Sequence, residues 1–119
     1  SEGSSITEGI GQGRITKNLE GIQVDHAFRI PDADSLSCTF GLIRDEGLMM
    51  GPSSGVNVCG AMALARTLGP GHTIVTILCD YGTRYSSKMF NLPFLKDKGL
   101  PTPDWVETTG TDLPNVCAE

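Results

Sequence analysis

The stretch "GLMMGPSSGVNVCGAMALARTLGPGHTIVTILC", residues 47–79, decides the fold of this chain. It opens with a very short apolar run at residues 48–50, which predicts a strand. A helix is then predicted from Ser53 or Ser54 to Leu68, because a Gly-Pro pair follows and stops a helix. The many glycines and alanines of this helix let it lie close to a neighbouring sheet.

The end of the same stretch, residues 73–79, is a continuous run rich in β-branched and apolar residues. Such a run is typical of an inner parallel strand that is covered on both faces. Strand, helix and strand within about 30 residues form a βαβ unit with a right-handed crossover. The sequence therefore predicts an α/β fold with a parallel-rich sheet and flanking helices.

The part of the chain before this unit adds fewer elements. Residues 1–21 are rich in Gly, Ser and Thr and predict a loop, and residues 24–30 alternate as a strand does. Asp32 or Asp34 is predicted to cap a helix that runs to about Glu46. The apolar face of that helix is predicted to contain Leu36, Phe40 and Ile43.

The part after the unit predicts one more short helix, around residues 93–98. Residues 101–119 carry Pro, Thr and acidic residues without a period, so we expect a polar tail that wraps the surface or is disordered. The chain is accordingly divided into residues 1–100, a segment of one α/β domain, and the tail. Its opening "SEGSS" is typical of the middle of a longer polypeptide.

The composition limits the kinds of partner that the chain takes. It has 119 residues, of which 19% are charged and 39% hydrophobic, as in a globular domain. The net charge of -5 argues against nucleic-acid binding through a basic surface. No apolar run approaches the roughly 20 residues that a membrane span needs. We expect neither a nucleic-acid partner nor membrane insertion.

The four cysteines are far apart in the sequence, at Cys38, Cys59, Cys79 and Cys117. They form no CxxC pair and neither histidine has a nearby ligand partner, so no metal site is predicted. Cys59 and Cys79 fall within apolar elements and are predicted to be small buried hydrophobic residues. Unpaired thiols favour a reducing compartment. We therefore expect an intracellular protein, in the cytoplasm or in a mitochondrion or plastid.

A ligand site is predicted from the topology of the βαβ unit. In a parallel sheet the loops that leave the strands share one edge with the first turns of the helices, and ligands bind there. The turns "GPSSG", residues 51–55, and "DYGTRY", residues 80–85, should therefore meet. Ser53 and Ser54 either cap the helix, which stabilises it by about 1 kcal/mol, or hold a ligand. The run is neither GxGxxG nor a P-loop, so nucleotide binding is not supported.

Three segments carry a family resemblance: "EGSSITEGIGQGRITKNLEG", "EGLMMGPSSGVNVCGAMALARTLGPGHTIVTILCDYGTRY" and "FLKDKGLP". Together they resemble the C-terminal part of a cysteine synthase, from residue 1 to about residue 103. This pyridoxal-phosphate-dependent family includes O-acetylserine sulfhydrylase and cystathionine β-synthase. The resemblance implies that residues 1–100 form the C-terminal portion of the large domain of a tryptophan-synthase-β-like enzyme.

The resemblance implies a role for the first serine of the turn, Ser53, as a hydrogen-bond partner of the pyridine nitrogen of the cofactor. A carboxylate at this position would keep the nitrogen protonated and make the ring a strong electron sink, which favours transamination. A hydroxyl donates a hydrogen bond to a neutral nitrogen, and the positive end of the helix also disfavours protonation. Such a moderate sink suits β-replacement. Ser54 or the backbone then caps the helix.

The resemblance also implies a substrate loop, "EGIG" at residues 8–11, where Gly9 and Gly11 let the backbone approach the bound amino acid. The alternative for this loop is a flexible surface turn. The further residues that would border the pocket are Glu8, Ser54, Asp80 and Tyr81.

The Schiff-base lysine and the phosphate-binding cup of the family lie upstream of this segment, so no catalytic residue is assigned in this chain. Its candidate lysines do not stand in the family's lysine context: Lys17, Lys88, Lys96 and Lys98. We expect the chain alone to be inactive. Its expected partners are the N-terminal portion of the same enzyme, a second subunit in a homodimer, and a small amino-acid substrate.

The function that the resemblance implies is the synthesis of cysteine and acetate from O-acetylserine and sulfide. The alternative within the family is a cystathionine β-synthase that joins serine to homocysteine. A third alternative is a non-catalytic interaction module that keeps the scaffold without the reaction.

Overall fold

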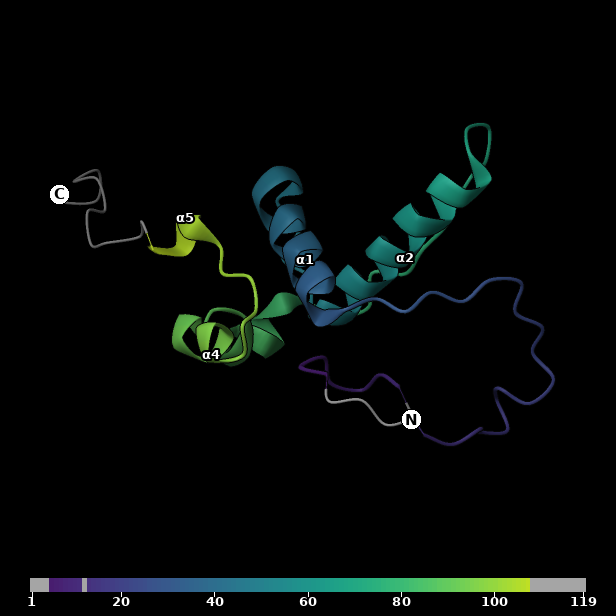
Figure 1. Ribbon diagram of the computed structural model, residues 1–119, viewed down its shortest axis with the longest axis horizontal. Helices are drawn as coiled ribbons and strands as arrows, with labels where there is room; N and C mark the ends of the chain where they lie inside the picture. Colours follow the sequence, from purple (N-terminus) through teal and green to yellow (C-terminus); the bar gives the residue numbers. More distant parts are fainter. Residues whose placement is uncertain (1–4, 12, 108–119) are drawn as a thin grey trace, which may run out of the picture.

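The computed structural model describes residues 5–11 and 13–107. The two long helices, α1 and α2, cross near one end and diverge as a V, and the short helices η1, α3 and α4 lie beside its closed end (Figure 1). The elements in chain order are α1 (Asp32–Glu46), α2 (Pro52–Leu68), η1 (Gly82–Tyr85), α3 (Ser86–Met89), α4 (Leu92–Asp97) and α5 (Asp104–Glu107).

Helix α1 confirms the predicted span, but its cap is not an aspartate side chain. The N-cap residue is Pro31, and no side chain in the described part of the chain caps the first turn. The Asp32 carboxylate instead accepts hydrogen bonds from the N-terminal segment, from Ser5 Oγ at 2.6 Å and from the Ile6 amide at 2.9 Å. The helix ends at Gly47, which adopts the left-handed conformation that a C-cap glycine favours (φ 68°).

Helix α2 begins at Pro52, one residue before Ser53 and two before Ser54, the two predicted starts, and it ends at Leu68 as predicted. Pro52 occupies its first turn, where the missing amide hydrogen of proline costs nothing. Gly51 is the N-cap, and no side chain among the described residues caps the helix. Of the two predicted alternatives, Ser54 or the backbone, the serine cap is therefore wrong.

The crossing of α1 and α2 depends on Gly55. A Cβ atom at this position would overlap the Ser35 carbonyl oxygen and the Thr39 hydroxyl. Glycine therefore lets the backbones of the two helices approach closely. Next to it, Ser35 Oγ donates a hydrogen bond to the Pro52 carbonyl at 2.8 Å, and both Ser35 and Thr39 are buried.

The predicted sheet is not confirmed by the described part of the chain. Residues 24–30 and 73–79 form no strand there, and residues 48–50 contribute only one antiparallel bridge, between Met50 and Tyr81. A strand exists only through hydrogen bonds to a neighbouring strand. Residues 73–79 run along α2, and none of the described residues forms a strand beside them.

The segment 73–79 is held to α2 by side chains. Asn57 Nδ2 donates to the Ile77 carbonyl at 2.9 Å, and the Cys79 amide donates to Ser54 Oγ at 2.9 Å. Its apolar side chains face solvent, with Val75 85% and Ile77 66% exposed. The prediction that Cys59 and Cys79 are buried is therefore wrong: Cys79 is exposed and Cys59 is half-buried.

The apolar core lies between α1 and the short helices. Its buried side chains are Leu36, Phe40, Met89 and Leu95, with Ile43 packed against them, which confirms the predicted apolar face of α1. Trp105 of α5 packs edge-on against Phe40, with ring centroids 6.3 Å apart. The start of the predicted tail thus joins the core, while residues 108–119 lie outside the described residues.

None of the helices in residues 5–11 and 13–107 combines the length and the apolar character that a membrane span requires.

Candidate functional site

The turns before α2 and before η1 lie against each other, as the topology predicts. The Gly51 amide donates to the Asp80 carbonyl at 2.8 Å, and the Gly82 amide donates to the Met49 carbonyl at 2.9 Å. The bridge between Met50 and Tyr81 lies between these two bonds. We define residues 49–54 and 80–85 as the candidate site.

Glycines make this close approach possible. A Cβ atom at Gly51 would lie 2.7 Å from Asp80 Oδ1 and 2.7 Å from Cε2 of the Tyr85 ring. A Cβ atom at Gly82 would lie 2.8 Å from the Met50 carbonyl oxygen. All three distances are shorter than ordinary Cβ contacts. A side chain at Gly51 would displace the side chains of Asp80 and Tyr85, and one at Gly82 would collide with the Met50 backbone, so glycine favours the contact between the two turns.

Asp80 organises the polar side chains of the candidate site. Its Oδ2 accepts a hydrogen bond of 2.6 Å from the Tyr85 hydroxyl and lies 3.6 Å from Nη1 of Arg84. Its Oδ1 accepts from Ser53 Oγ at 3.4 Å. The hydrogen bond to the Asp80 carboxylate raises the pKa of the Tyr85 phenol above its ordinary value, because it favours the protonated form.

Ser53 and Ser54 have different surroundings although they are adjacent. Ser53 is half-buried in the first turn of α2, and its only side-chain hydrogen bond among the described residues is the long one to Asp80. Ser54 is fully buried and accepts from the Cys79 amide. Ser54 therefore fixes the segment that leads into the second turn, and Ser53 keeps hydrogen-bonding capacity for another group.

The other predicted pocket residue, Tyr81, contributes its backbone to the candidate site. Its side chain is 72% exposed. Tyr85 was missed by the sequence reasoning, although the last position of "DYGTRY" lies one helical turn beyond Asp80.

One ion pair joins the predicted substrate loop, residues 8–11, to α3, the helix that follows the candidate site. Glu8 pairs with Lys88 of α3, and this hydrogen bond and the Lys88 charge lower the pKa of the Glu8 carboxyl, with a further contribution from Arg84. Gly9 and Gly11 both adopt positive φ angles, 75° and 70°. Lys88 thus has a structural partner, and the loop is joined to the same region of the chain as Asp80 and Tyr85.

A buried hydroxyl next to this loop was also missed by the sequence reasoning. Thr7 is 6% exposed, and its Oγ1 has no hydrogen-bond partner among the described residues. An unpaired buried hydroxyl costs about 1–3 kcal/mol, so such a group is expected to meet a polar partner in the functional state.

The chemistry of the candidate site is that of binding and orientation. In the described ranges no group of three or more His, Cys, Asp and Glu side chains is placed to hold a metal ion. The site instead offers a neutral hydroxyl at the positive end of α2, with a carboxylate and a phenol behind it. This arrangement suits a polar aromatic ring or an amino acid.

No protein-family model matches the chain. It is similar to "Cysteine synthase 2" of Schizosaccharomyces pombe, with 42% identity over 98 residues, which cover 81% of this chain and 25% of the relative. It is similar to "Cysteine synthase 1" of Emericella nidulans, with 45% identity over 100 residues, 82% of this chain and 27% of the relative.

A cystathionine β-synthase is also among the relatives. The protein of that name from Dictyostelium discoideum is 36% identical over 98 residues, which cover 82% of this chain and 20% of the relative. The chain thus spans about a quarter of the length of the curated relatives that it matches. Because about four fifths of its length matches cysteine synthases at this identity, the chain is homologous to a segment of the cysteine synthases.

Proposed function

We propose that this chain is part of a cysteine synthase that converts O-acetylserine and sulfide to cysteine and acetate with pyridoxal phosphate. The observation that carries the proposal is the identity of 42–45% to proteins named cysteine synthase over about four fifths of the chain. The cofactor supplies the electron sink for this chemistry when it is bound.

The residues of the candidate site fit one edge of this cofactor. Ser53 has a hydroxyl with spare hydrogen-bonding capacity at the first turn of α2, where the helix dipole disfavours a protonated ring nitrogen. Its bond to Asp80 is long at 3.4 Å, so the hydroxyl is able to turn its proton to the nitrogen. We propose that Ser53 donates to the ring nitrogen and that Asp80 and Tyr85 fix the surrounding turn.

Residues 8–11 are proposed as the loop that contacts the amino-acid substrate. Positive φ angles at Gly9 and Gly11 and the open space around both residues support an exposed backbone there. The Thr7 hydroxyl beside the loop has no hydrogen-bond partner among the described residues, which supports a polar group from substrate or cofactor in the same place. Glu8 pairs with Lys88, so we assign its side chain to anchoring the loop rather than to substrate contact.

We further propose that the rest of the enzyme completes the sheet. Residues 73–79 have strand-like composition and exposed apolar side chains but no neighbouring strand in the described part of the chain. Strands of the N-terminal portion would pair with them to form the parallel-rich sheet of an α/β domain. The homodimer and the cytoplasmic or organellar location stay predictions.

A chimera tests the proposed function. This chain would replace the matching segment of the Emericella nidulans cysteine synthase 1, and the product would be assayed with O-acetylserine and sulfide. We expect cysteine formation and the absorbance of bound pyridoxal phosphate. The unaltered relative is the control for expression and cofactor content.

The outcome also separates the alternatives. Turnover of serine with homocysteine, without turnover of O-acetylserine, would favour the cystathionine β-synthase activity, which the Dictyostelium relative supports. A folded chimera that holds the cofactor but makes neither product would favour a non-catalytic module. Either result would contradict the proposed function.

A further inference from the structure

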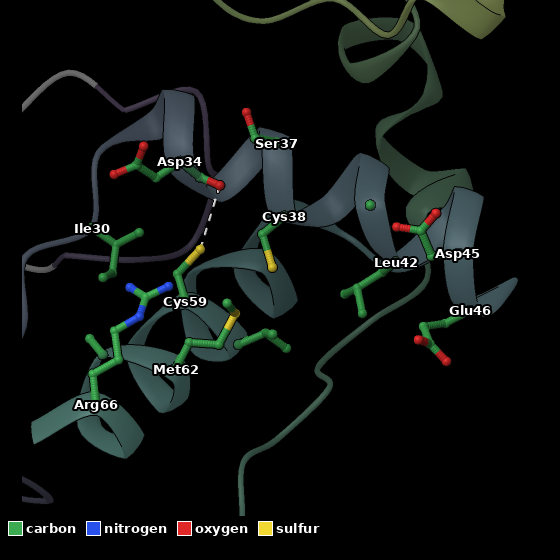
Figure 2. A pocket seen from close by; sticks show the side chains of 13 residues that line it. Ile30, Asp34, Ser37, Cys38, Leu42, Asp45, Glu46, Cys59, Met62 and Arg66 are labelled. Atoms are coloured by element: carbon green, nitrogen blue, oxygen red, sulfur yellow. Dashed lines mark hydrogen bonds between the residues drawn. The ribbon is translucent and has the colours of Figure 1, made fainter. Parts of the chain in front are cut away.

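An open groove of about 770 Å³ lies between α1 and α2 (Figure 2). Its walls come from the facing sides of these two helices and from Ile30. None of the residues of the candidate site lines it. Cys38 of α1 and Cys59 of α2 both point into the groove, from opposite walls.

The two cysteines lie beside the closest approach of the helices. Cys38 follows Ser35 by three residues and Cys59 follows Gly55 by four, so each lies one turn from the crossing and on the same side of its helix. The Cys59 thiol also reaches the α1 backbone, because its Sγ donates to the Asp34 carbonyl at 3.5 Å. The crossing therefore places both thiols on the walls of the same groove.

The two thiols face the same groove, and Cys38 is close enough to affect the ionisation of Cys59. Burial raises the pKa of the Cys59 thiol to about 12, with further contributions from the charge of Cys38, from a side-chain hydrogen bond with it and from Asp34, while Arg66 acts in the opposite direction. Cys59 therefore stays protonated near neutral pH. Since the thiolate is the nucleophile in disulfide exchange, the reaction of this pair begins at Cys38.

We propose that Cys38 and Cys59 form a dithiol site that small disulfides oxidise reversibly to a bond between α1 and α2. The Cys38 sulfur attacks one sulfur of the small disulfide, which breaks that S–S bond and releases one thiol. Cys59 then loses its proton and attacks the Cys38 sulfur, which releases the second thiol. Two protein S–H groups become one S–S bond, and the small disulfide takes up both electrons and both protons.

The bond would fix the angle between the two long helices. It would close the loop from Cys38 to Cys59, and this loop includes the turn before α2 and Ser53. An excess of small thiol would reduce the Cys38–Cys59 disulfide again by the same exchange steps. The other cysteine whose position the structure describes, Cys79, is exposed on the segment after α2 and serves as the internal control.

Peptide mapping of the whole chain tests this proposal with oxidised glutathione as the oxidant. Trypsin cuts after Lys and Arg, so the four cysteines fall in four separate peptides, residues 30–44, 45–66, 67–84 and 99–119. We expect the peptides 30–44 and 45–66 to become joined, with the mass of two hydrogen atoms lost. We expect the link to disappear after treatment with excess reduced glutathione.

Variants test the order of the steps. Cys59→Ser should stop the reaction at glutathione bound to Cys38, and Cys79→Ser should leave the link unchanged. The wild-type map needs no variant, so it decides the question even where a variant fails to fold. Glutathione mainly on Cys79, with Cys38 and Cys59 left as free thiols, or a random mixture of links, would overturn the proposal.

Discussion

Asp80 shows how a single side chain organises the candidate site. Its carbonyl accepts from the Gly51 amide, and its carboxylate accepts from Ser53 and Tyr85. The sequence places Asp80 at the end of an apolar run and so predicts its position, but not these bonds. Tyr85 was missed because its role depends on the 3₁₀ turn that carries it back over Asp80.

Replacing Ser53 tests the proposed contact with the ring nitrogen. In the chimera, Ser53→Ala should lower turnover about threefold to tenfold, because the variant loses the one hydrogen bond proposed between Ser53 and the ring nitrogen. Ser53→Asp should favour a protonated nitrogen and raise transamination of the substrate. The cofactor absorbance spectrum should change in both, and Ser87→Ala, an exposed serine on α3, is the matched control. Unchanged turnover and spectrum in both variants would refute the assignment.

Titration of the phenols tests the bond between Asp80 and Tyr85. Because the pKa of Tyr85 is raised in the folded chain, its hydrogen bond to Asp80 stabilises the fold at pH values below the ordinary phenol pKa of about 10. This stabilisation is lost as the pH rises through the pKa that Tyr85 has in the folded chain. Asp80→Asn should therefore lower the midpoint of tyrosinate absorbance for Tyr85, and Asp97→Asn should not. Tyr85→Phe identifies the transition. A midpoint that does not change in Asp80→Asn would contradict the hydrogen bond.

At the scale of the elements, local signals predict the helices well and the sheet poorly. The spans of α1 and α2 follow from the glycines at their ends and from the spacing of apolar residues, all of which are local. The predicted side-chain caps at the helix starts were wrong because the Asp32 carboxylate accepts from the distant Ser5, and Ser54 accepts from the Cys79 amide. A strand requires a partner far away in the sequence, and local composition does not supply it.

The packing of α1 on α2 is tested by two glycines of the same helix. Gly55→Ala should destabilise the chain by about 1–3 kcal/mol, because its methyl group overlaps Ser35 and Thr39. Gly60→Ala should be neutral or stabilise the helix by up to about 1 kcal/mol, because no atom of the described residues lies within 4 Å of the Cβ position, the helix's own nearby backbone aside. Urea unfolding followed by helical circular dichroism measures both. Equal urea midpoints for Gly55→Ala and Gly60→Ala would contradict close packing of α1 on α2 at Gly55.

At the scale of the whole molecule, the apolar segment at residues 73–79 is exposed and has no neighbouring strand in the described part of the chain. Val75 and Ile77 face solvent although their composition is that of a buried strand. The sequence predicted the convergence of the two turns, and the structure has it through the bonds of Gly51 and Gly82. The turns therefore meet without the sheet, because backbone hydrogen bonds join them directly.

Hydrogen exchange tests whether residues 73–79 become a strand in the complete enzyme. Their amides should exchange on the order of a hundredfold more slowly in the chimera than in the isolated chain, because a ladder forms with the added strands. The amides of α2 serve as the reference, since they are bonded within the helix in both. Equal exchange of residues 73–79 in the two proteins would contradict the completed sheet.

The most direct test of the central claim is a crystal structure of the chimera with pyridoxal phosphate bound. The measured quantity is the distance from Ser53 Oγ to the pyridine nitrogen. The account predicts a hydrogen bond, with a distance below about 3.2 Å, and Asp80 and Tyr85 behind the serine. A Ser53 hydroxyl turned away from the ring, or a cofactor bound away from residues 49–54 and 80–85, would contradict it.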